Sequence, residues 1–128
     1  MVNDARIPPH PDLADISLQQ VLEALVDPVR RSILTQLAAA DDDIKCGGFD
    51  LAVSTSTATH HFKVLREAGL IRQYYVGTSR LNTLRRDEVD RVFPGLIASI
   101  VAAEGQRGAG SSATTRSGRS AKRTPSVA

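Results

Sequence analysis

The sequence is poor in the residues that build cross-linked or aromatic-rich folds. Its 128 residues include no Trp, 4% aromatic residues and one cysteine, Cys46. A single cysteine excludes an intrachain disulfide framework and is typical of a reducing compartment. No apolar run approaches the ~20 residues of a membrane helix, and the first residues lack the apolar segment of a secretory signal. We therefore expect one cytoplasmic domain with a core of Leu, Val, Ile and Ala.

Positive charge is also scarce, except at the end of the chain. The net charge of +2 conceals a division, because residues 105–128 carry five Arg or Lys and no acid, which leaves 11 basic and 14 acidic residues before them. The same 24 residues lack periodicity and bulky apolar side chains, so we expect a disordered basic tail. Any basic binding surface of the folded part must then be a local patch.

Helix caps, apolar spacing and turn residues predict the elements. Residues 1–16 contain several prolines and are expected to form a partly ordered arm that docks through Ile7, Leu13 and Ile16. Residues 17–104 are expected to form one domain. Within it, the predicted helices are 18–26, 28–40, 49–53, 54–68, 87–93 and a last one from residue 96. Ser17 and Asp27 are the N-caps of the first two helices, and Gly69 is the C-cap of the fourth. The predicted strands are 71–76 and 81–84.

This order predicts a mainly α domain of the α+β type. Five to six helices surround one two-stranded hairpin, and the short helix 49–53 followed by the helix 54–68 forms a helix-turn-helix. A hairpin that follows at once, with a turn at residues 77–80, is a wing. The predicted fold is therefore a winged helix-turn-helix.

The stretch STSTATHHFKVLREAGL, residues 54–70, carries the functional prediction. Ser and Thr are mediocre helix formers, so their concentration there serves something other than helix stability. Ala58, Phe62 and Leu65 share one face, and the opposite face is small and polar, which allows close approach to phosphates and base edges. The candidate DNA-contacting residues are therefore Ser56, Thr59, His60 and Lys63 on this helix and Thr78, Ser79 and Arg80 in the wing.

Several residues have a plainer interpretation. His61 lies on the flank of the helix and is expected to be a packed, hydrogen-bonded histidine. Arg30 and Arg31 are expected to be surface charges, with contact to the DNA backbone as the alternative. Cys46 is expected to be a small apolar side chain, with oxidation or an inter-subunit thiol bond that perturbs DNA binding as the competing hypothesis.

The segments DPVRRSIL, LAVSTSTATHHFKVLREAGLI and YYVGTSRLNTL resemble, in order and spacing, the ArsR-type winged-helix repressors over residues 17–104. The resemblance implies a homodimer that pairs through its terminal helices and releases DNA when an effector binds. Each subunit would place residues 54–63 in the major groove of an inverted-repeat operator, which adds Ser54, Thr55 and Thr57 to the candidate DNA contacts. Thr59 stands where the family often has Ser. The implied dimer-interface residues are Leu18, Val21, Leu22, Leu25, Val92, Leu96, Ile97 and Ile100.

The sequence departs from the metal-sensing members of that family. Those members use cysteine pairs near the short helix or His and carboxylate ligands on the last helix, whereas this chain has one thiol and no His or Cys after Arg80. We therefore expect no metal and no cofactor, and a regulator that responds to a small organic molecule of unknown identity or to no effector. Three alternatives stay open: a metal or redox sensor acting through Cys46, a winged helix used only for protein–protein assembly, and an enzyme that combines Cys46 or a hydroxyl with His60 or His61. The enzyme is disfavoured because adjacent helical histidines point about 100° apart.

Overall fold

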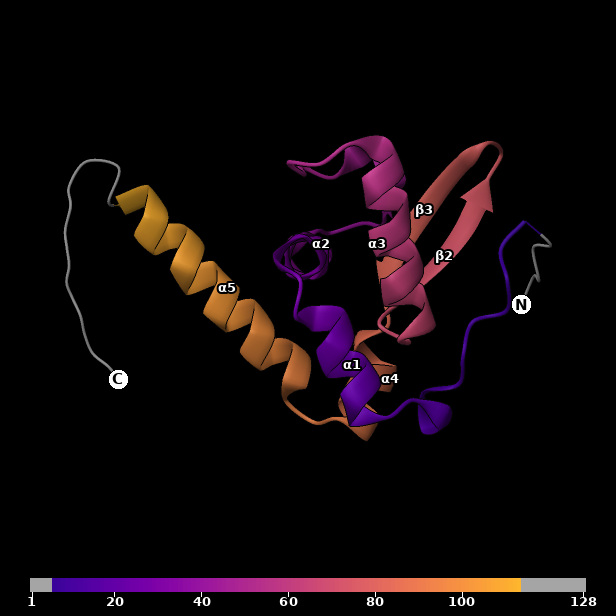
Figure 1. The fold of residues 1–128 in the computed structure, drawn as a ribbon, viewed down its shortest axis with the longest axis horizontal. Coiled ribbons are helices and arrows are strands. Elements are labelled where there is room, and N and C mark those ends of the chain that lie inside the picture. The colour runs from indigo at the N-terminus through magenta and orange to yellow at the C-terminus, as the bar shows by residue number, and fades with distance from the viewer. Residues whose placement is uncertain (1–5, 114–128) are drawn as a thin grey trace.

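The computed structural model describes residues 6–113, with the side chains described as far as Gln106. Five α-helices and two short 3-10 helices accompany one antiparallel sheet of three strands in the order β1-β3-β2, which confirms the predicted α+β winged-helix class (Figure 1). The elements are η1 (Leu13–Asp15), α1 (Leu18–Leu25), α2 (Pro28–Ala39), β1 (Ile44–Lys45), η2 (Cys46–Gly48), α3 (Thr55–Glu67), β2 (Ile71–Val76), β3 (Ser79–Leu84), α4 (Arg86–Val92) and α5 (Leu96–Ala113).

Side-chain caps set the starts of the first three α-helices. Ser17 and Gln20 form a reciprocal capping box at α1, Asp27 accepts the N–H of Val29 at 2.8 Å at α2, and Ser54 accepts the N–H of Thr57 at 3.2 Å at α3. Each bond satisfies a backbone donor that the helix cannot satisfy itself. The three predicted starts are therefore confirmed.

The core is aliphatic, as the composition predicts. Helix α2 lies at its centre, with α1, α3 and α5 around it (Figure 1). Ile33 and Leu34 of α2 are fully buried, and so are Leu65 of α3, Ile71 of β2 and Ile97 of α5. This core holds the inner face of α3 in place and leaves its other face outside.

The arm before α1 is docked on the domain. Ile7, Leu13 and Ile16 are all buried, which confirms the three predicted docking residues. Leu13 and Ile16 pack against the end of α3, where Gly69 adopts a left-handed backbone with φ of +77° and the N–H of Leu70 bonds the carbonyl of Leu65. The arm and the C-cap of α3 therefore share one packing contact.

The predicted short helix at residues 49–53 is wrong. The chain forms only the 3-10 turn η2 and then runs without regular structure to Ser54. The side chain of Gln36 on α2 accepts the N–H of Asp50 at 3.0 Å and donates to its carbonyl at 2.9 Å. Because an isolated helix of five residues is unstable, these tertiary bonds and the packing of Phe49 on Phe62, with ring centroids 5.2 Å apart, determine the conformation instead.

Two boundaries also differ from expectation. Ile44 and Lys45 pair with Asn82 and Leu81, which adds strand β1 to the expected hairpin. Helix α5 continues to Ala113 past the expected break at Gly105. Gly105 costs about 1 kcal/mol relative to Ala inside a helix, which does not end a helix that meets no proline. The expectation of disorder for residues 114–128 lies outside the described residues.

The implied dimer residues divide into two groups. Val21, Leu25 and Ile97 are buried in the core of the single chain, so their assignment to a subunit interface is wrong. The apolar side of α1 is wide enough to face both the core and solvent. The remaining members are exposed or half-buried: Leu18, Leu22, Val92, Leu96 and Ile100. A membrane-spanning helix is absent from the part of the chain that the structure describes.

The left-handed cap at Gly69 generates a stability prediction. Gly69→Ala places a Cβ in a left-handed backbone, 3.2 Å from both Leu13 methyl groups and 3.3 Å from Ile16, and we expect a loss of about 1–3 kcal/mol in the free energy of unfolding. Chemical denaturation measures it. Gly47→Ala, where no atom lies within 4 Å, is the matched control; equal losses in both variants contradict the prediction.

Candidate nucleic-acid interface

The outer face of α3 is exposed and polar. Ser54, Ser56, Thr59, His60 and Lys63 are all exposed, as the helical spacing predicts. The hydroxyl of Thr59 donates to the carbonyl of Thr55 at 3.0 Å, so its oxygen remains free to accept a hydrogen bond from outside. The longer side chains of His60 and Lys63 project from the same face. Two further predicted contacts on this helix, Thr55 and Thr57, are exposed as well.

The inner face of α3 anchors the helix. Ala58, Phe62 and Leu65 are buried. His61 is 7% exposed, and its Nδ1 lies 3.0 Å from Nη1 of Arg30. Arginine has no acceptor, so Nδ1 accepts and the imidazole is neutral. Burial lowers the pKa of His61, and the Arg30 guanidinium lowers it further, against the opposing charge of Asp27. The predicted role of His61 as a packed histidine is confirmed.

Arg30 and Arg31 are not simple surface charges, which corrects the expectation. Arg30 donates to the carbonyl of Ala24 at 2.6 Å, and Arg31 donates to the carbonyls of Leu25 and Val26 at 2.9 and 3.0 Å. Arg31 also pairs with Glu104 of α5 at 2.7 Å. Both side chains donate to carbonyls that have no partner within α1, and their positive charges interact favourably with the negative end of the α1 dipole. They therefore hold α1, α2 and α5 together.

A buried chain of polar side chains joins α3 to the wing. Arg66 of α3 donates to Oε1 of Gln73 at 2.7 Å, and Gln73 donates to Oδ1 of Asn82 on the paired strand at 2.9 Å. Asn82 donates to the carbonyl of Ile44 at 3.1 Å. Sequence reasoning missed this chain, although the alternation of β2 places Gln73 on the same inner face as Ile71.

Cys46 lies at the end of this chain. Its Sγ is 3.3 Å from Nδ2 of Asn82 and 3.8 Å from Nε2 of Gln73, both of which donate to it. The side chain is half-buried. A cavity of about 140 Å³ lies beside it, between the η2 segment and the first turns of α3, with Phe49, Leu51 and Phe62 in its wall. The redox hypothesis for Cys46 stays a prediction.

The wing turns through two residues, Gly77 and Thr78, because Val76 pairs directly with Ser79. Gly77 has a φ of +62°, a conformation typical of the first position of a tight hairpin turn. Ser79 and Arg80 therefore belong to β3 and not to the turn. Strand β3 thus begins two residues earlier than predicted. Thr78 is exposed, and Ser79 and Arg80 are half-buried.

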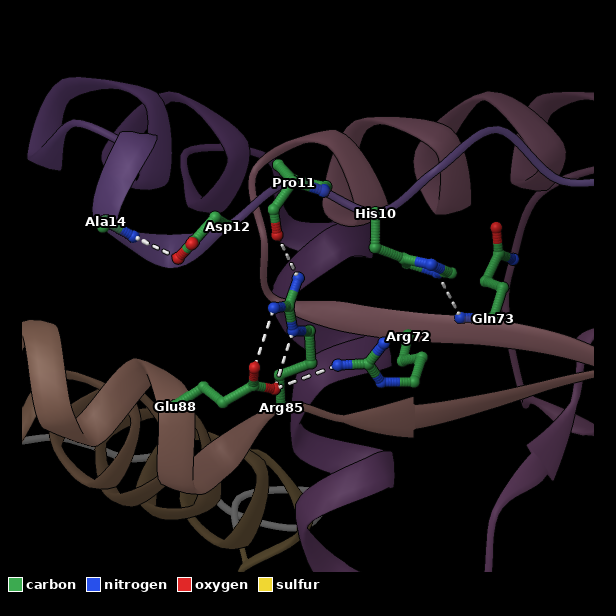
Figure 2. A network of polar contacts seen from close by, with 8 residues as sticks. All are labelled: His10, Pro11, Asp12, Ala14, Arg72, Gln73, Arg85 and Glu88. Atoms are coloured by element: carbon green, nitrogen blue, oxygen red, sulfur yellow. Dashed lines mark hydrogen bonds and ion pairs between the residues drawn. The ribbon is translucent and has the colours of Figure 1, made fainter. Parts of the chain in front are cut away.

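The arm lies along β2, the outer strand of the sheet. His10 accepts the N–H of Gln73 on Nε2 at 2.9 Å, and Arg85 donates to the carbonyl of Pro11 at 2.8 Å (Figure 2). Glu88 binds Arg85 through both carboxylate oxygens, each at 2.9 Å, and Arg72 at 3.2 Å. The hydrogen bond from Arg85 lowers the pKa of Glu88 to about 2. This network ties the arm, the hairpin and α4 to one another.

Comparison with known proteins gives a consistent result. No protein-family model matches the chain. An uncharacterised HTH-type transcriptional regulator, YceK of Bacillus subtilis strain 168, is 31% identical over 83 residues, which cover 63% of this chain and 83% of the relative. An ArsR-like transcriptional regulator from Rhodococcus sp. RHA1 has a solved structure with a TM-score of 0.51 and 26% identity, over 84% of this chain and 95% of that one.

The chain belongs to the ArsR-type family of winged-helix transcriptional regulators. A second solved ArsR family regulator has the same fold, with a TM-score of 0.51 at 22% identity, over 73% of this chain and 91% of that one. The relatives of this ArsR-type protein are transcriptional regulators and not enzymes, in agreement with the expected absence of catalysis. In the described part of this regulator, no three His, Cys, Asp or Glu side chains come together as a set that could hold a metal ion.

His10 generates a prediction of pH dependence. Burial lowers its pKa below the ordinary 6.5, and the charges of Arg72, Arg85 and Arg66 add to the effect. A lowered pKa means that the folded protein binds fewer protons than the unfolded chain. The stability that neutral His10 contributes is therefore complete above pH 6.5 and is lost as the pH falls below it.

His10→Gln keeps an acceptor for the Gln73 amide and removes the titration. We expect the free energy of unfolding to fall less between pH 7.5 and about 5.5 in this variant than in the wild type. Denaturant titration at a series of pH values measures both proteins. His61 titrates in both and cancels in the comparison, so identical pH profiles refute the assignment.

Proposed function

We propose that this ArsR-type regulator is a dimeric repressor whose helix α3 reads a duplex operator from the major groove. The observation that carries the proposal is the division of α3 into a fully anchored inner face and an exposed face of small hydroxyls with His60 and Lys63. Short side chains allow the helix to approach base edges, and its capped N-terminus favours a phosphate nearby. The proposed contacts on α3 are Ser54, Thr55, Ser56, Thr57, Thr59, His60 and Lys63, and those of the wing are Thr78, Ser79 and Arg80.

The exposed apolar residues support a homodimer. Leu18 and Leu22 of α1 and Val26 at its C-cap repeat every four residues and form one apolar stripe. They are 51%, 47% and 71% exposed. Val92 of α4 is 41% exposed. A two-fold dimer places two copies of α3 on an inverted repeat, with half-sites about 34 Å apart or a multiple of that distance.

Release of the operator by a small-molecule effector is part of the proposal, as the family resemblance implies. The cavity of about 140 Å³ supports it, because Thr55, Ala58 and Thr59 of α3 line it together with the η2 segment. A molecule bound there would contact the same helix that faces DNA.

The exposed polar face of α3 generates the first functional prediction. His60→Ala removes an exposed donor and acceptor from the middle of α3, and we expect a loss of about 1–3 kcal/mol in binding to a selected operator, roughly 5- to 150-fold in affinity. Operator sequences are first selected from random DNA. Fluorescence anisotropy then measures wild type and variant on the selected duplex and on a scrambled duplex.

Equal losses on the two duplexes would assign His60 to a phosphate instead of a base. Absence of salt-dependent DNA binding by the wild type would overturn the proposal and favour a winged helix used for protein–protein assembly. Repeating the selection with metals or oxidant tests the alternative that Cys46 senses either of them.

The apolar stripe generates a second prediction. Leu22→Glu places a carboxylate in the proposed dimer contact, and we expect the dimer dissociation constant to rise by roughly tenfold or more, because an unpaired charge is costly to bury. Analytical ultracentrifugation measures it. Ala52→Glu, which adds the same charge at an exposed site outside the helices, is the matched control; an unchanged dimer in Leu22→Glu contradicts the interface.

A further inference from the structure

The docked arm places an arginine next to the hairpin turn. Arg6 donates from Nη1 to the carbonyl of Gly77 at 3.0 Å, and its guanidinium carbon lies 3.8 Å from the centroid of the Tyr75 ring. Ile7 is buried immediately after it, and His10 bonds the backbone of Gln73 three residues later. The position of Arg6 is therefore set by the hairpin, although the two segments are distant in sequence.

A second guanidinium binds the same tyrosine. Arg80 donates to the phenol oxygen of Tyr75 from Nη2 at 2.8 Å and from Nε at 3.2 Å, and its guanidinium carbon is 5.2 Å from the ring centroid. Tyr75 thus holds two cationic groups, one from the arm and one from β3. The ion pairs between described residues involve three arginines, Arg31, Arg72 and Arg85. Arg80 is not among them, so no described carboxylate forms an ion pair with it.

The two arginines lie at the end of the molecule that faces the proposed operator. The hairpin turn and the N-terminal half of α3 point toward the same end in Figure 1, with the arm running beside β2. Arg6 and Thr78 are exposed there. Guanidinium groups held in place by stacking and hydrogen bonds lose little freedom on binding a phosphate, which they recognise through paired N–H donors.

We propose that the N-terminal arm is a second DNA-contacting element, in which Arg6, held by Tyr75 and Gly77, binds the sugar-phosphate backbone together with Arg80. This inference rests on the proposed function and adds a binding residue that lies outside the winged helix itself. The arm places a second guanidinium group beside the wing, in a domain whose residues before 105 carry 11 bases and 14 acids. Its contact carries no sequence information, because phosphate contacts position a protein without reading bases.

The test is the salt dependence of duplex binding. The full chain and Arg6→Gln are titrated with a selected operator duplex at several KCl concentrations. Each lost phosphate contact lowers the slope of log K against log salt by about 0.9, and we expect that decrease for Arg6→Gln with preference for the operator over scrambled DNA retained. Arg6→Lys keeps the charge and is expected to restore most of the slope. Arg91→Gln, an exposed arginine on α4, is the control and is expected to keep the wild-type slope.

The outcomes separate the two proposals. If the slope of log K against log salt is the same in Arg6→Gln as in the wild type, the arm does not contact DNA. Arg6 then only stabilises the packing of the arm on the hairpin. An equal decrease of the slope in Arg91→Gln also overturns it, because the loss then follows the net charge of the protein and not the position of Arg6. Absence of DNA binding by the wild type overturns the proposed function and this inference together.

Discussion

The orientation of α3 relative to the wing depends on the buried hydrogen-bonded chain of Arg66, Gln73 and Asn82. Gln73 and Asn82 are 2% and 0% exposed, so each of their amide groups must find a partner inside the protein. Leaving one such group unpaired costs about 1–3 kcal/mol. Because hydrogen bonds are directional, the chain favours one angle between helix and hairpin more strongly than apolar packing does. Helix α3 and the hairpin are thereby joined by directional bonds in addition to apolar packing.

Arginine side chains connect most of the remaining parts. Arg30 and Arg31 close the end of α1, and Arg85 links the arm to α4 through Pro11 and Glu88. These guanidinium groups are occupied inside the protein, in a region where acids outnumber bases by 14 to 11. Positive charge for a polyanion must therefore come from a few exposed groups.

Local signals predicted the parts of the fold that local chemistry determines. Ser17, Asp27 and Ser54 began their helices and Gly69 ended α3, because capping needs only neighbouring residues. The exposed and buried faces of α3 also followed from spacing alone. The conformation of the segment after η2 did not follow from spacing, because the side chain of Gln36 on α2 bonds the N–H and the carbonyl of Asp50. Three other features likewise depend on contacts between residues that are distant in the sequence, which no sequence period encodes. These are the pairing of Arg30 with His61, the division of α1 between core and solvent, and the position of the arm beside β2.

The docked arm has a consequence for how the molecules behave toward one another at high concentration. Strand β2 is at an edge of the sheet, and an open edge is a template for pairing with a strand of another chain. Here the side chain of His10 binds the outward N–H of Gln73 on β2, and that of Arg6 binds the carbonyl of Gly77 in the adjoining turn. Pro8, Pro9 and Pro11 interrupt the backbone donors that a continuing ladder would need. The opposite edge is the two-residue strand β1, too short to recruit a partner. Both edges of the sheet are thus poor templates for pairing with another chain, one because it is only two residues long and the other because the proline-rich arm lies on it.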